Sequence, residues 1–527
     1  MLRRHFLYTG LLTACAMKLA RTPFAKQQDS ATLTLLVDPE PPTLVALTNA
    51  GDPTMLVSAK VTEGLLAYDF DLTPRAQLAI AWSVNPQCTE FSFRLRQGVR
   101  WHDGTPFTSR DVASSIALLR ELHTRGRATF ANLTEVRTPD AYTAIIALSK
   151  PSPYLLYALA ACESPITPAH IYAGKNPQTN PNGVAPIGTG PFIFREWVRA
   201  SHIVFERNRD YWDKPKPFVD RIVVRFIEDE QEKIAAIESQ AIDLAPATSI
   251  SLKALRRLQA NPDLDFVADG YQYTNQVVRL EFNLEHPILG NLGVRQAIAH
   301  TLNRQDIIDQ AWLGYADPAF GPISPHLKRF FSPNLPSYAF DLHQAERLLD
   351  QAGYARGADG VRFRLPLDYI PAGDGYKNTA DCVAQMLARV GIAAELRTQS
   401  FSDYIQRIYT DRDFAFSVNR MNNMFDPSVG VQRLYWSKNI RKGVPFSNAS
   451  HYSNKEVDAL LEQAAVEPDF AMRLKLFKLF QERLSHDLPD LTLLAPKLLT
   501  IANKRVVDHT VTADGIAGNL ANARIKI

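Results

Sequence analysis

The stretch that decides the fold runs from Arg362 to Met421 and reads RFRLPLDYIPAGDGYKNTADCVAQMLARVGIAAELRTQSFSDYIQRIYTDRDFAFSVNRM. Its apolar runs have the length and composition of strands, and they cover 362–370, 392–396 and 413–421. Apolar residues recur at helical spacing in the two segments between them, 377–390 and 401–409. Strands that alternate with helices require a parallel sheet with crossover helices, so this stretch predicts an α/β fold.

Polar side chains follow the third of these strands. The chain reads NRMNNMFDP from position 419 to position 427. In an open parallel sheet, small ligands bind beyond the carboxyl ends of the strands, and a few well-placed polar groups fix them there. A solvated loop is the alternative interpretation. The placement favours ligand contact, and the predicted ligand-binding residues here are Asn419, Arg420, Asn422, Asn423 and Asp426.

The length and composition describe a globular chain with more than one hydrophobic core. The chain has 527 residues, of which 46% are hydrophobic and 21% are charged. A chain of this length exceeds the size of a single core, so at least two domains are expected. The formal net charge of +3 is small for this length and does not suggest a nucleic acid or an anionic membrane as a partner.

The first residues have the pattern of a secretory signal. Arg3 and Arg4 precede a short apolar run at 8–16 that is too short to span a membrane. Together with Phe6 and Leu7, the two arginines are similar to a twin-arginine export motif, and an ordinary signal peptide is the alternative. Either interpretation predicts export to the periplasm.

Two processing sites compete in this segment. Residues 14–16 read ACA, which has the small-x-small form of a cleavage site. Residues 12–15 read LTAC, which resembles a lipobox in which Cys15 would be acylated. Lys18 and Arg21 fit neither pattern well, and we favour the free form over the lipoprotein.

Motifs for catalysis, cofactors and metals are missing from the sequence. No GxSxG, HExxH or CxxC pattern occurs, and the glycines at 188 and 190 lack the Gly-Lys-Ser/Thr of a phosphate loop. His102 and Asp103 are neighbours whose side chains point to opposite faces, so a packed turn is favoured over a catalytic pair. The sequence therefore predicts no enzyme activity, no cofactor and no metal site. One disulfide is possible, but the sequence does not choose the pair among Cys88, Cys162 and Cys382.

Several motifs in a fixed order carry a family resemblance. They are Leu78-Ala79-x-Ala81-Trp82-x-Val84, Phe93-x-Leu95-Arg96-x-Gly98-Val99-x-Trp101-His102-Asp103-Gly104-x-Pro106-Phe107-Thr108, Pro186 to Phe192, Arg207-Asn208-x-Asp210-Tyr211-Trp212 and Val294 to Ile298. Together they resemble the signature of family 5 extracellular solute-binding proteins, the dipeptide-, oligopeptide- and nickel-binding components of ABC importers. The resemblance runs from about residue 32 to the C-terminus.

The resemblance implies a two-lobe periplasmic-binding-protein fold of the α/β class. It has mixed sheets, hinge strands and an extra subdomain in the first lobe. On this chain we expect an export segment and linker at 1–30, followed by three structural parts. These parts are lobe I at 31–69, 186–275 and 500–527, its subdomain at 70–185, and lobe II at 276–499.

The resemblance also implies a function without covalent chemistry. Lobe closure would capture a peptide-like solute in the periplasm and present it to an ABC permease, with the protein acting as a monomer. A secreted hydrolase, or a periplasmic sensor or chaperone on the same fold, are the alternatives.

The predicted ligand site departs from the pattern of the peptide binders. In those proteins an aspartate three residues before the acid of an acid-Pro pair binds the ligand ammonium, and Asn423 stands at that position here. Arg420 suggests a carboxylate or other acidic group, as in an opine-like, modified-peptide or sugar-acid solute. Asp426 is an alternative partner for an amine. Phe130 matches a first-lobe aromatic that packs on the ligand, and Arg127 nearby completes the predicted site.

Overall fold

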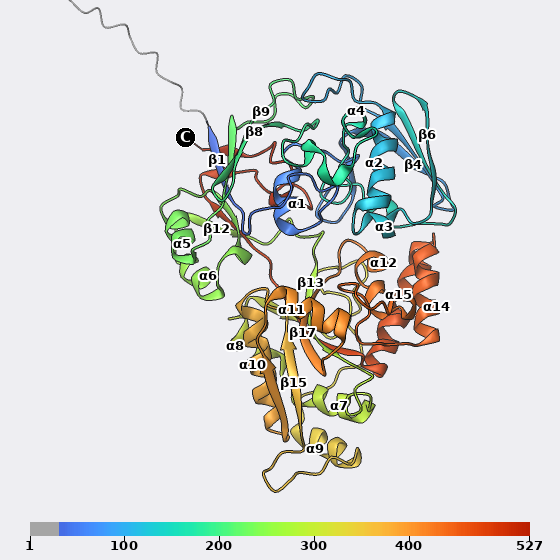
Figure 1. Ribbon diagram of the computed structural model, residues 1–527, viewed down its shortest axis with the longest axis vertical. Helices are drawn as coiled ribbons and strands as arrows, with labels where there is room; N and C mark the ends of the chain where they lie inside the picture. Colours follow the sequence, from blue (N-terminus) through green and yellow to red (C-terminus); the bar gives the residue numbers. More distant parts are fainter. Residues whose placement is uncertain (1–30, 527) are drawn as a thin grey trace, which may run out of the picture.

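The computed structural model describes residues 31–526 and places most strands in two large sheets and a smaller one (Figure 1). The upper part of Figure 1 contains the seven-stranded sheet and the four-stranded sheet, and the lower part contains the six-stranded sheet. We call the part around the seven-stranded sheet lobe I, the part around the four-stranded sheet the subdomain, and the lower part lobe II. The predicted export segment, with Cys15, lies outside the described residues.

Lobe I is built on a mixed sheet to which distant parts of the chain contribute. Its strand order is β12 (Leu264–Val267), β19 (Thr500–Asn503), β11 (Leu244–Pro246), β1 (Thr32–Leu36), β10 (Arg221–Arg225), β9 (His202–Arg207) and β8 (Phe192–Val198). Strand β1 pairs in parallel with β10 and β11, and the remaining pairs are antiparallel. Strand β19, from near the end of the chain, lies between β11 and β12 in this sheet. Helices α1 (Asp52–Ser58), α5 (Glu230–Glu238) and α6 (Leu252–Leu258) belong to this lobe.

The subdomain is an antiparallel sheet covered by one long helix. Its strand order is β4 (Ala79–Val84), β5 (Glu90–Leu95), β7 (Thr143–Leu148) and β6 (Leu133–Asp140). Helix α2 (Ser109–Leu122) begins at a capping box, in which the Thr108 amide donates to the Asp111 carboxylate (2.8 Å). The short helix α3 (Gly126–Thr129) follows it.

A fully buried carboxylate joins several of the sequence motifs in lobe I. Glu63 accepts hydrogen bonds from the Tyr211 hydroxyl (2.8 Å), the Trp212 indole (3.0 Å) and the Thr189 hydroxyl (2.8 Å). The Gln77 amide is a fourth donor at 3.4 Å. Burial raises the pKa of Glu63 to about 7, although these donors act in the opposite direction.

The glycines of the GTGPF motif are required by a close backbone approach. A Cβ atom on Gly188 would lie 1.9 Å from the Val61 carbonyl oxygen, and one on Gly190 would lie 2.6 Å from it. The Gly190 amide donates to that same carbonyl (2.9 Å). The motif is therefore a tight connection, and it positions Thr189 against Glu63.

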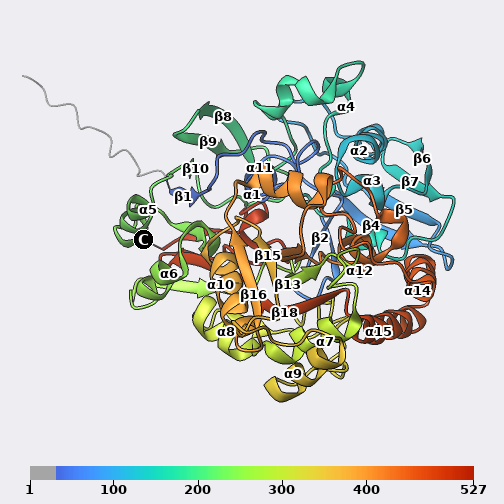
Figure 2. The ribbon, with the colours of Figure 1, turned by 60° about the horizontal axis from the view of Figure 1, so that its bottom comes forward.

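Lobe II contains the predicted β-α-β-α-β unit. Its strand order is β14 (Ala316–Pro318), β18 (Asp490–Pro496), β13 (Gln276–Phe282), β17 (Phe416–Asn422), β15 (Phe363–Tyr369) and β16 (Ile392–Arg397). Strand β15 pairs in parallel with β16 and β17, which confirms the predicted parallel sheet. The crossover helices are α10 (Asp374–Ala388) and α11 (Phe401–Ile405). Figure 2 shows α10 beside this sheet and the pair α14 (Lys455–Val466) and α15 (Phe470–Asp487) at the opposite side of the lobe.

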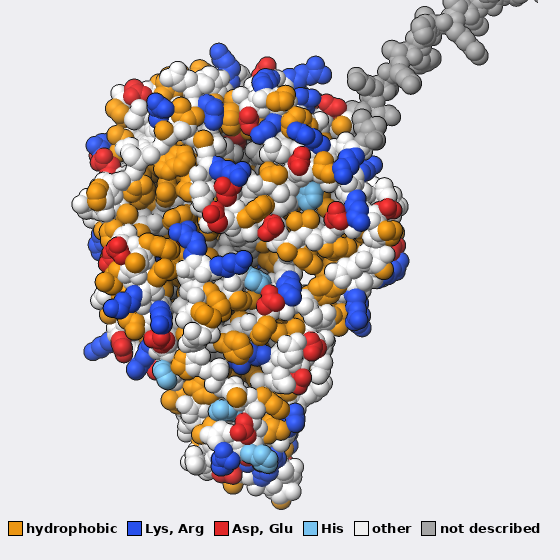
Figure 3. Space-filling view, turned by 180° about the vertical axis from the view of Figure 1, so that it is seen from behind, with side chains coloured by type: hydrophobic (Ala, Val, Ile, Leu, Met, Phe, Trp, Pro, Cys, Tyr) orange, Lys and Arg blue, Asp and Glu red, His pale blue; other side chains and the backbone are white. Residues whose placement is uncertain are grey.

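Charged side chains of both signs are mixed on the surface. Figure 3 shows basic and acidic side chains interspersed over one face, without a large region of a single sign. Within residues 31–526, no helix combines the length and the apolar character that a membrane crossing requires.

The raised pKa of Glu63 predicts a pH-dependent stability. Between the ordinary carboxyl pKa of 4.5 and about 7, the folded protein holds a proton that the unfolded chain releases. The contribution of Glu63 is therefore complete below the unfolded pKa and is lost as the pH rises through 7, with a slope of up to about 1.4 kcal/mol per pH unit. Glu63→Gln should remove this slope, measured as urea unfolding free energy between pH 5 and 8.

The matched control is Glu121→Gln, which changes an exposed glutamate of α2. This variant should keep the wild-type pH dependence. Parallel pH profiles for wild type and Glu63→Gln would contradict the protonation of Glu63 in the folded state.

Candidate functional site

The sheet of lobe II has a topological switch point between β15 and β17. The chain leaves β15 for β16 on one side and then returns to β17 on the other side. Loops that follow the carboxyl ends of two such strands separate and leave a crevice in which ligands bind. Strand β17 (Phe416–Asn422) and the loop after it together carry five of the seven predicted site residues, three in the strand and two in the loop.

A hollow of about 660 Å³ opens beside this switch point and is lined by both lobes. We call it the interlobe hollow. Lobe I lines it with residues that include Ala247, Thr248, Ser251 and Leu255. Lobe II lines it with residues that include Gln276, Trp312, Gly373, Tyr376 and Arg420. A ligand held there would contact both lobes at once, which is the geometry that closure of two lobes requires.

Arg420 is the predicted site residue that lines the hollow. Its guanidinium acts on the nearby Tyr376 hydroxyl, which donates its proton to Gln276 Oε1 (2.7 Å). Burial lowers the pKa of Arg420, but Tyr376 and Asp52 outweigh this effect and the net pKa is raised. Arg420 is therefore a cation, and it forms no salt bridge with any described carboxylate. Asn422 lies next to it and accepts from Gln276 Nε2 (3.1 Å).

Lobe I contributes a carboxylate to the surroundings of Arg420. Asp52 is the first residue of α1 and is exposed. Its charge raises the pKa of both Arg420 and Tyr376, although burial is the largest influence on each group. Among residues 31–526, Asp52 has no ion-pair partner. Asp374 of lobe II also lines the hollow as an exposed carboxylate, and it too has no ion pair among residues 31–526. The unpaired charges at and near the hollow thus include Arg420, Asp374 and Asp52.

Asn419 and Asn423 have internal partners. Asn419 Nδ2 donates to Glu281 (3.1 Å) and to the Tyr409 hydroxyl (2.9 Å), and its side chain has no exposed surface. Asn423 accepts from the Ser324 amide (2.5 Å) and donates to a backbone carbonyl at position 322 (3.2 Å). The Asn419 amide therefore fixes strand β17 within lobe II, and the Asn423 amide holds the loop after it.

Asp426 forms a buried ion pair. Both of its carboxylate oxygens accept from Arg473, at 2.7 and 2.5 Å, and each side chain is at most 2% exposed. One oxygen also accepts from the Ser428 amide (2.9 Å) at the start of α12 (Pro427–Gly430). The carboxylate is thus already neutralised in this arrangement. An amine of the solute could bind Asp426 only by displacing Arg473.

Phe130 and Arg127 lie away from the interlobe hollow. Phe130 is fully buried in the core of the subdomain, in the same cluster as Leu119 and Leu155. Arg127 is exposed and donates to the Glu121 carbonyl (2.8 Å). Neither residue lines the hollow, because α3 packs back on α2 and directs Phe130 into the subdomain core.

Sequence reasoning missed three residues of this region. Tyr376 follows the carboxyl end of β15, and the rule that identified the loop after β17 applies to it equally. Gln276 begins a strand that joins the lobes, and Asp52 begins a short helix of lobe I. No local pattern marks either of them as polar contacts of a site.

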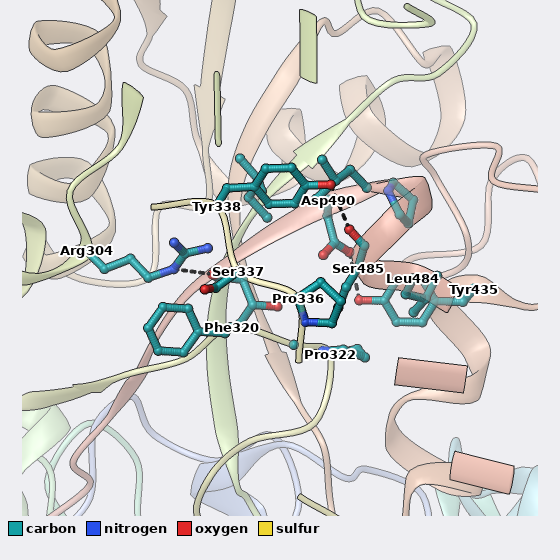
Figure 4. Close-up of a pocket in the computed structure, with 15 residues that line it drawn as sticks. Arg304, Phe320, Pro322, Pro336, Ser337, Tyr338, Tyr435, Leu484, Ser485 and Asp490 are labelled. Atoms are coloured by element: carbon teal, nitrogen blue, oxygen red, sulfur yellow. Dashed lines mark hydrogen bonds between the residues drawn. The ribbon is translucent and has the colours of Figure 1, made fainter. Parts of the chain in front are cut away.

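A second hollow, of about 400 Å³, lies within lobe II (Figure 4). Its polar groups are bonded to one another. The Tyr338 hydroxyl donates to the Ser485 carbonyl (3.1 Å), and the Tyr435 hydroxyl donates to Asp490 (2.7 Å). Arg304 donates its Nε to two backbone carbonyls, each at 3.0 Å. Every lining residue belongs to lobe II, so closure of the lobes would not enclose a ligand there.

The three cysteines of the described chain are all free thiols, at positions 88, 162 and 382. Within the same residues, no group of three or more His, Cys, Asp or Glu side chains is arranged to hold a metal ion.

The buried pair predicts that Asp426 contributes to stability rather than to solute affinity. Asp426→Ala leaves the Arg473 charge buried without a partner and should lower the unfolding free energy by about 3–5 kcal/mol. Asp359→Ala is the control, because Asp359 is 61% exposed in its ion pair with Arg364 and should change the free energy by less than about 1 kcal/mol. Urea unfolding measures both variants. Unchanged stability combined with a loss of solute binding in Asp426→Ala would instead assign Asp426 to the ligand site.

Comparison with known proteins places the chain in a family. The sequence model of the family described as "bacterial extracellular solute-binding proteins, family 5 Middle" matches residues 73–443 of this chain. A Brucella ovis protein that carries the name of an ABC transporter peptide-binding protein is 30% identical over 380 residues, which are 69% of each chain. The glutathione-binding protein GsiB of Escherichia coli is 23% identical over 467 residues, 87% of this chain and 88% of that protein.

A solved structure supports the two-lobe fold. AgaA from A. tumefaciens R10, in complex with agropinic acid, superposes with a TM-score of 0.77 and is 26% identical. The match covers 94% of this chain and 99% of AgaA, which confirms the predicted α/β fold of the periplasmic binding proteins. The chain therefore belongs to family 5 of the bacterial extracellular solute-binding proteins, as a substrate-binding protein of an ABC transporter for peptides or related solutes.

Proposed function

We propose that this substrate-binding protein captures an acidic, peptide-like solute in the interlobe hollow and delivers it to its permease after lobe closure. The observation that carries this proposal is Arg420, a guanidinium that lines the hollow without a carboxylate partner among the described residues. A planar guanidinium binds carboxylates through paired, charge-assisted hydrogen bonds. An acidic group of the solute would supply the missing partner.

The proposed site also offers a carboxylate for an amine group of the solute. Asp52 is the exposed carboxylate that acts on Arg420 from lobe I. A molecule with a carboxylate at Arg420 and an ammonium group toward Asp52 would neutralise both charges and join the lobes. Two related proteins have ligands of compatible chemistry, since AgaA was solved with agropinic acid and GsiB is named for glutathione. Opine-like compounds and acidic peptides are therefore the candidate solutes.

Contacts between the lobes support capture by closure. The Tyr315 hydroxyl of lobe II donates to Gln259 of lobe I (2.6 Å). Arg329 of lobe II donates to the Tyr157 hydroxyl of the subdomain (2.9 Å), and its guanidinium lies 4.4 Å from the centre of that ring. These contacts join the lobes in the described arrangement, and a ligand that binds both lobes would stabilise an arrangement of this kind. The permease would then recognise the closed form.

The location follows from the same proposal. The secretory pattern at 1–30 supports export to the periplasm. The same segment is compatible with the twin-arginine route or the ordinary one, and with acylation at Cys15 or release of the free protein. Solute capture requires binding and release alone, and no covalent step enters the proposed cycle.

Arg420→Gln should weaken solute binding at least tenfold, because a hydrogen-bonded charge contributes about 1.5–3 kcal/mol. The solute is first released from wild-type protein that was purified without denaturation, and mass spectrometry identifies it. Calorimetry then measures its affinity for wild type, Arg420→Gln and Arg441→Gln, a control that changes an exposed arginine of the same lobe.

The expected result is a loss of affinity confined to Arg420→Gln. A solute without an acidic group, or equal affinities for all three proteins, would contradict the acidic-solute proposal. The assignment of the chain to its family would be unaffected by either outcome.

A further inference from the structure

A carboxylate of lobe II lines the interlobe hollow together with Arg420. Asp374 is the first residue of α10, and its side chain is exposed on the wall of the hollow. Among residues 31–526 it forms no ion pair and accepts no hydrogen bond. Lys377, one turn further along the helix, is instead paired with Asp381 (2.8 Å). The Asp374 carboxylate is therefore available to a cation that enters the hollow.

The start of α10 explains an acidic residue at this position only in part. A carboxylate in the first turn of a helix interacts favourably with the helix dipole. That interaction does not require the side chain to line a cavity, and the lining of the hollow by Asp374 is a separate observation. The cap residue before it is Gly373, which has a φ of 122° and no side chain to act on the helix or on a ligand.

Two aromatic side chains line the hollow beside this carboxylate. Trp312 and Tyr376 pack edge to face, with their ring centres 5.5 Å apart. The Trp312 indole donates to the Thr379 hydroxyl (2.9 Å), and a Cβ atom on Gly375 would lie 2.8 Å from the indole ring. Because Gly375 alone separates Asp374 from Tyr376, the carboxylate and both rings meet at the start of α10. Carboxylates and aromatic rings are the groups that bind an ammonium ion.

The unpaired charges on the wall of the hollow lie on either side of Tyr376. Its hydroxyl interacts with the Arg420 guanidinium, and its backbone is two residues from Asp374. Lys497 is the remaining charged residue of the wall and is paired with Asp317 (3.1 Å). A solute with acidic groups alone would neutralise Arg420 but would bring negative charge toward Asp374. A solute with an acid and an amine at one end would neutralise both.

We propose that Asp374, together with the rings of Trp312 and Tyr376, binds an ammonium group of the solute. The ammonium group and the carboxylate at Arg420 then belong to one zwitterionic head group, as in an α-amino acid. This inference rests on the proposed function and narrows its substrate class. It assigns the amine to a carboxylate of lobe II that lines the hollow, whereas Asp52 of lobe I does not line it.

The test uses two probes that differ in the ammonium group alone. S-methylglutathione has an α-ammonium and an α-carboxylate at its γ-glutamyl end, and its N-acetyl derivative lacks the ammonium. The S-methyl group prevents exchange with the free thiols of the protein. Acetylation makes the probe more anionic, so attraction to Arg420 alone would favour the acetylated probe. A subsite for the ammonium group favours the free amine.

Calorimetry compares wild type with Asp374→Asn, Asp52→Asn and the exposed control Asp359→Asn. Wild type, Asp52→Asn and Asp359→Asn should bind S-methylglutathione at least tenfold more tightly than its N-acetyl derivative. Asp374→Asn should lose this preference. The readout is a ratio of two affinities in the same protein, so a general loss of folded protein would leave it unchanged.

A tenfold preference that persists in Asp374→Asn would overturn the inference. Loss of the preference in Asp52→Asn, with Asp374→Asn unchanged, would assign the amine to lobe I and leave the proposed function standing. Equal binding of both probes by wild type, with weaker binding of both by Arg420→Gln, would have the same meaning for the inference and for the proposed function. If wild type binds neither probe, the inference fails, and the solute released from wild type decides the proposed function separately.

Discussion

Lobe I depends on the hydrogen bonds that converge on the buried carboxylate of Glu63. A carboxyl group has two oxygens with several acceptor sites, so it can bind donors from different segments at once. Here the donors come from Gln77, Thr189 and the neighbours Tyr211 and Trp212. Glu63 precedes the subdomain in the sequence, Gln77 lies near its start, and the other donors follow its end. Their attachment to one carboxylate therefore fixes where the subdomain leaves the main sheet and where it returns.

Polar groups of β17 and of the loop after it are of two kinds: some attach the loop to lobe II, and Arg420 lines the interlobe hollow. Asn423 and Asp426 use their groups to attach the loop to the rest of lobe II. This attachment holds the end of β17 in place, so Arg420 projects into the interlobe hollow from a rigid strand. A binding group on a supported strand loses less conformational entropy when the ligand binds than one on a loose loop. The two uses of the loop are thus complementary.

The sequence predicts the local elements well and the fates of single polar side chains less well. The β-α-β-α-β unit depends on local patterns of apolar residues, and it appears in the structure. The hydrogen-bond partners of the loop side chains do not depend on local patterns. Asn423 accepts from Ser324 and Asp426 accepts from Arg473, and both partners are distant in the chain. No local pattern distinguishes these side chains from Arg420. Only the tertiary structure decides which polar group is left without a partner.

Charge balance gives lobe closure a selectivity of its own. On the proposed function, closure covers Arg420, which has no ion pair among the described residues, while the nearby carboxylates of Asp52 and Asp374 are exposed. A closed form without a solute would leave this guanidinium without a counter-ion. A neutral peptide of the same size would fill the space but would leave the Arg420 charge unpaired. An anionic solute would pair with Arg420, so charge as well as shape would select the ligand that best stabilises the closed form.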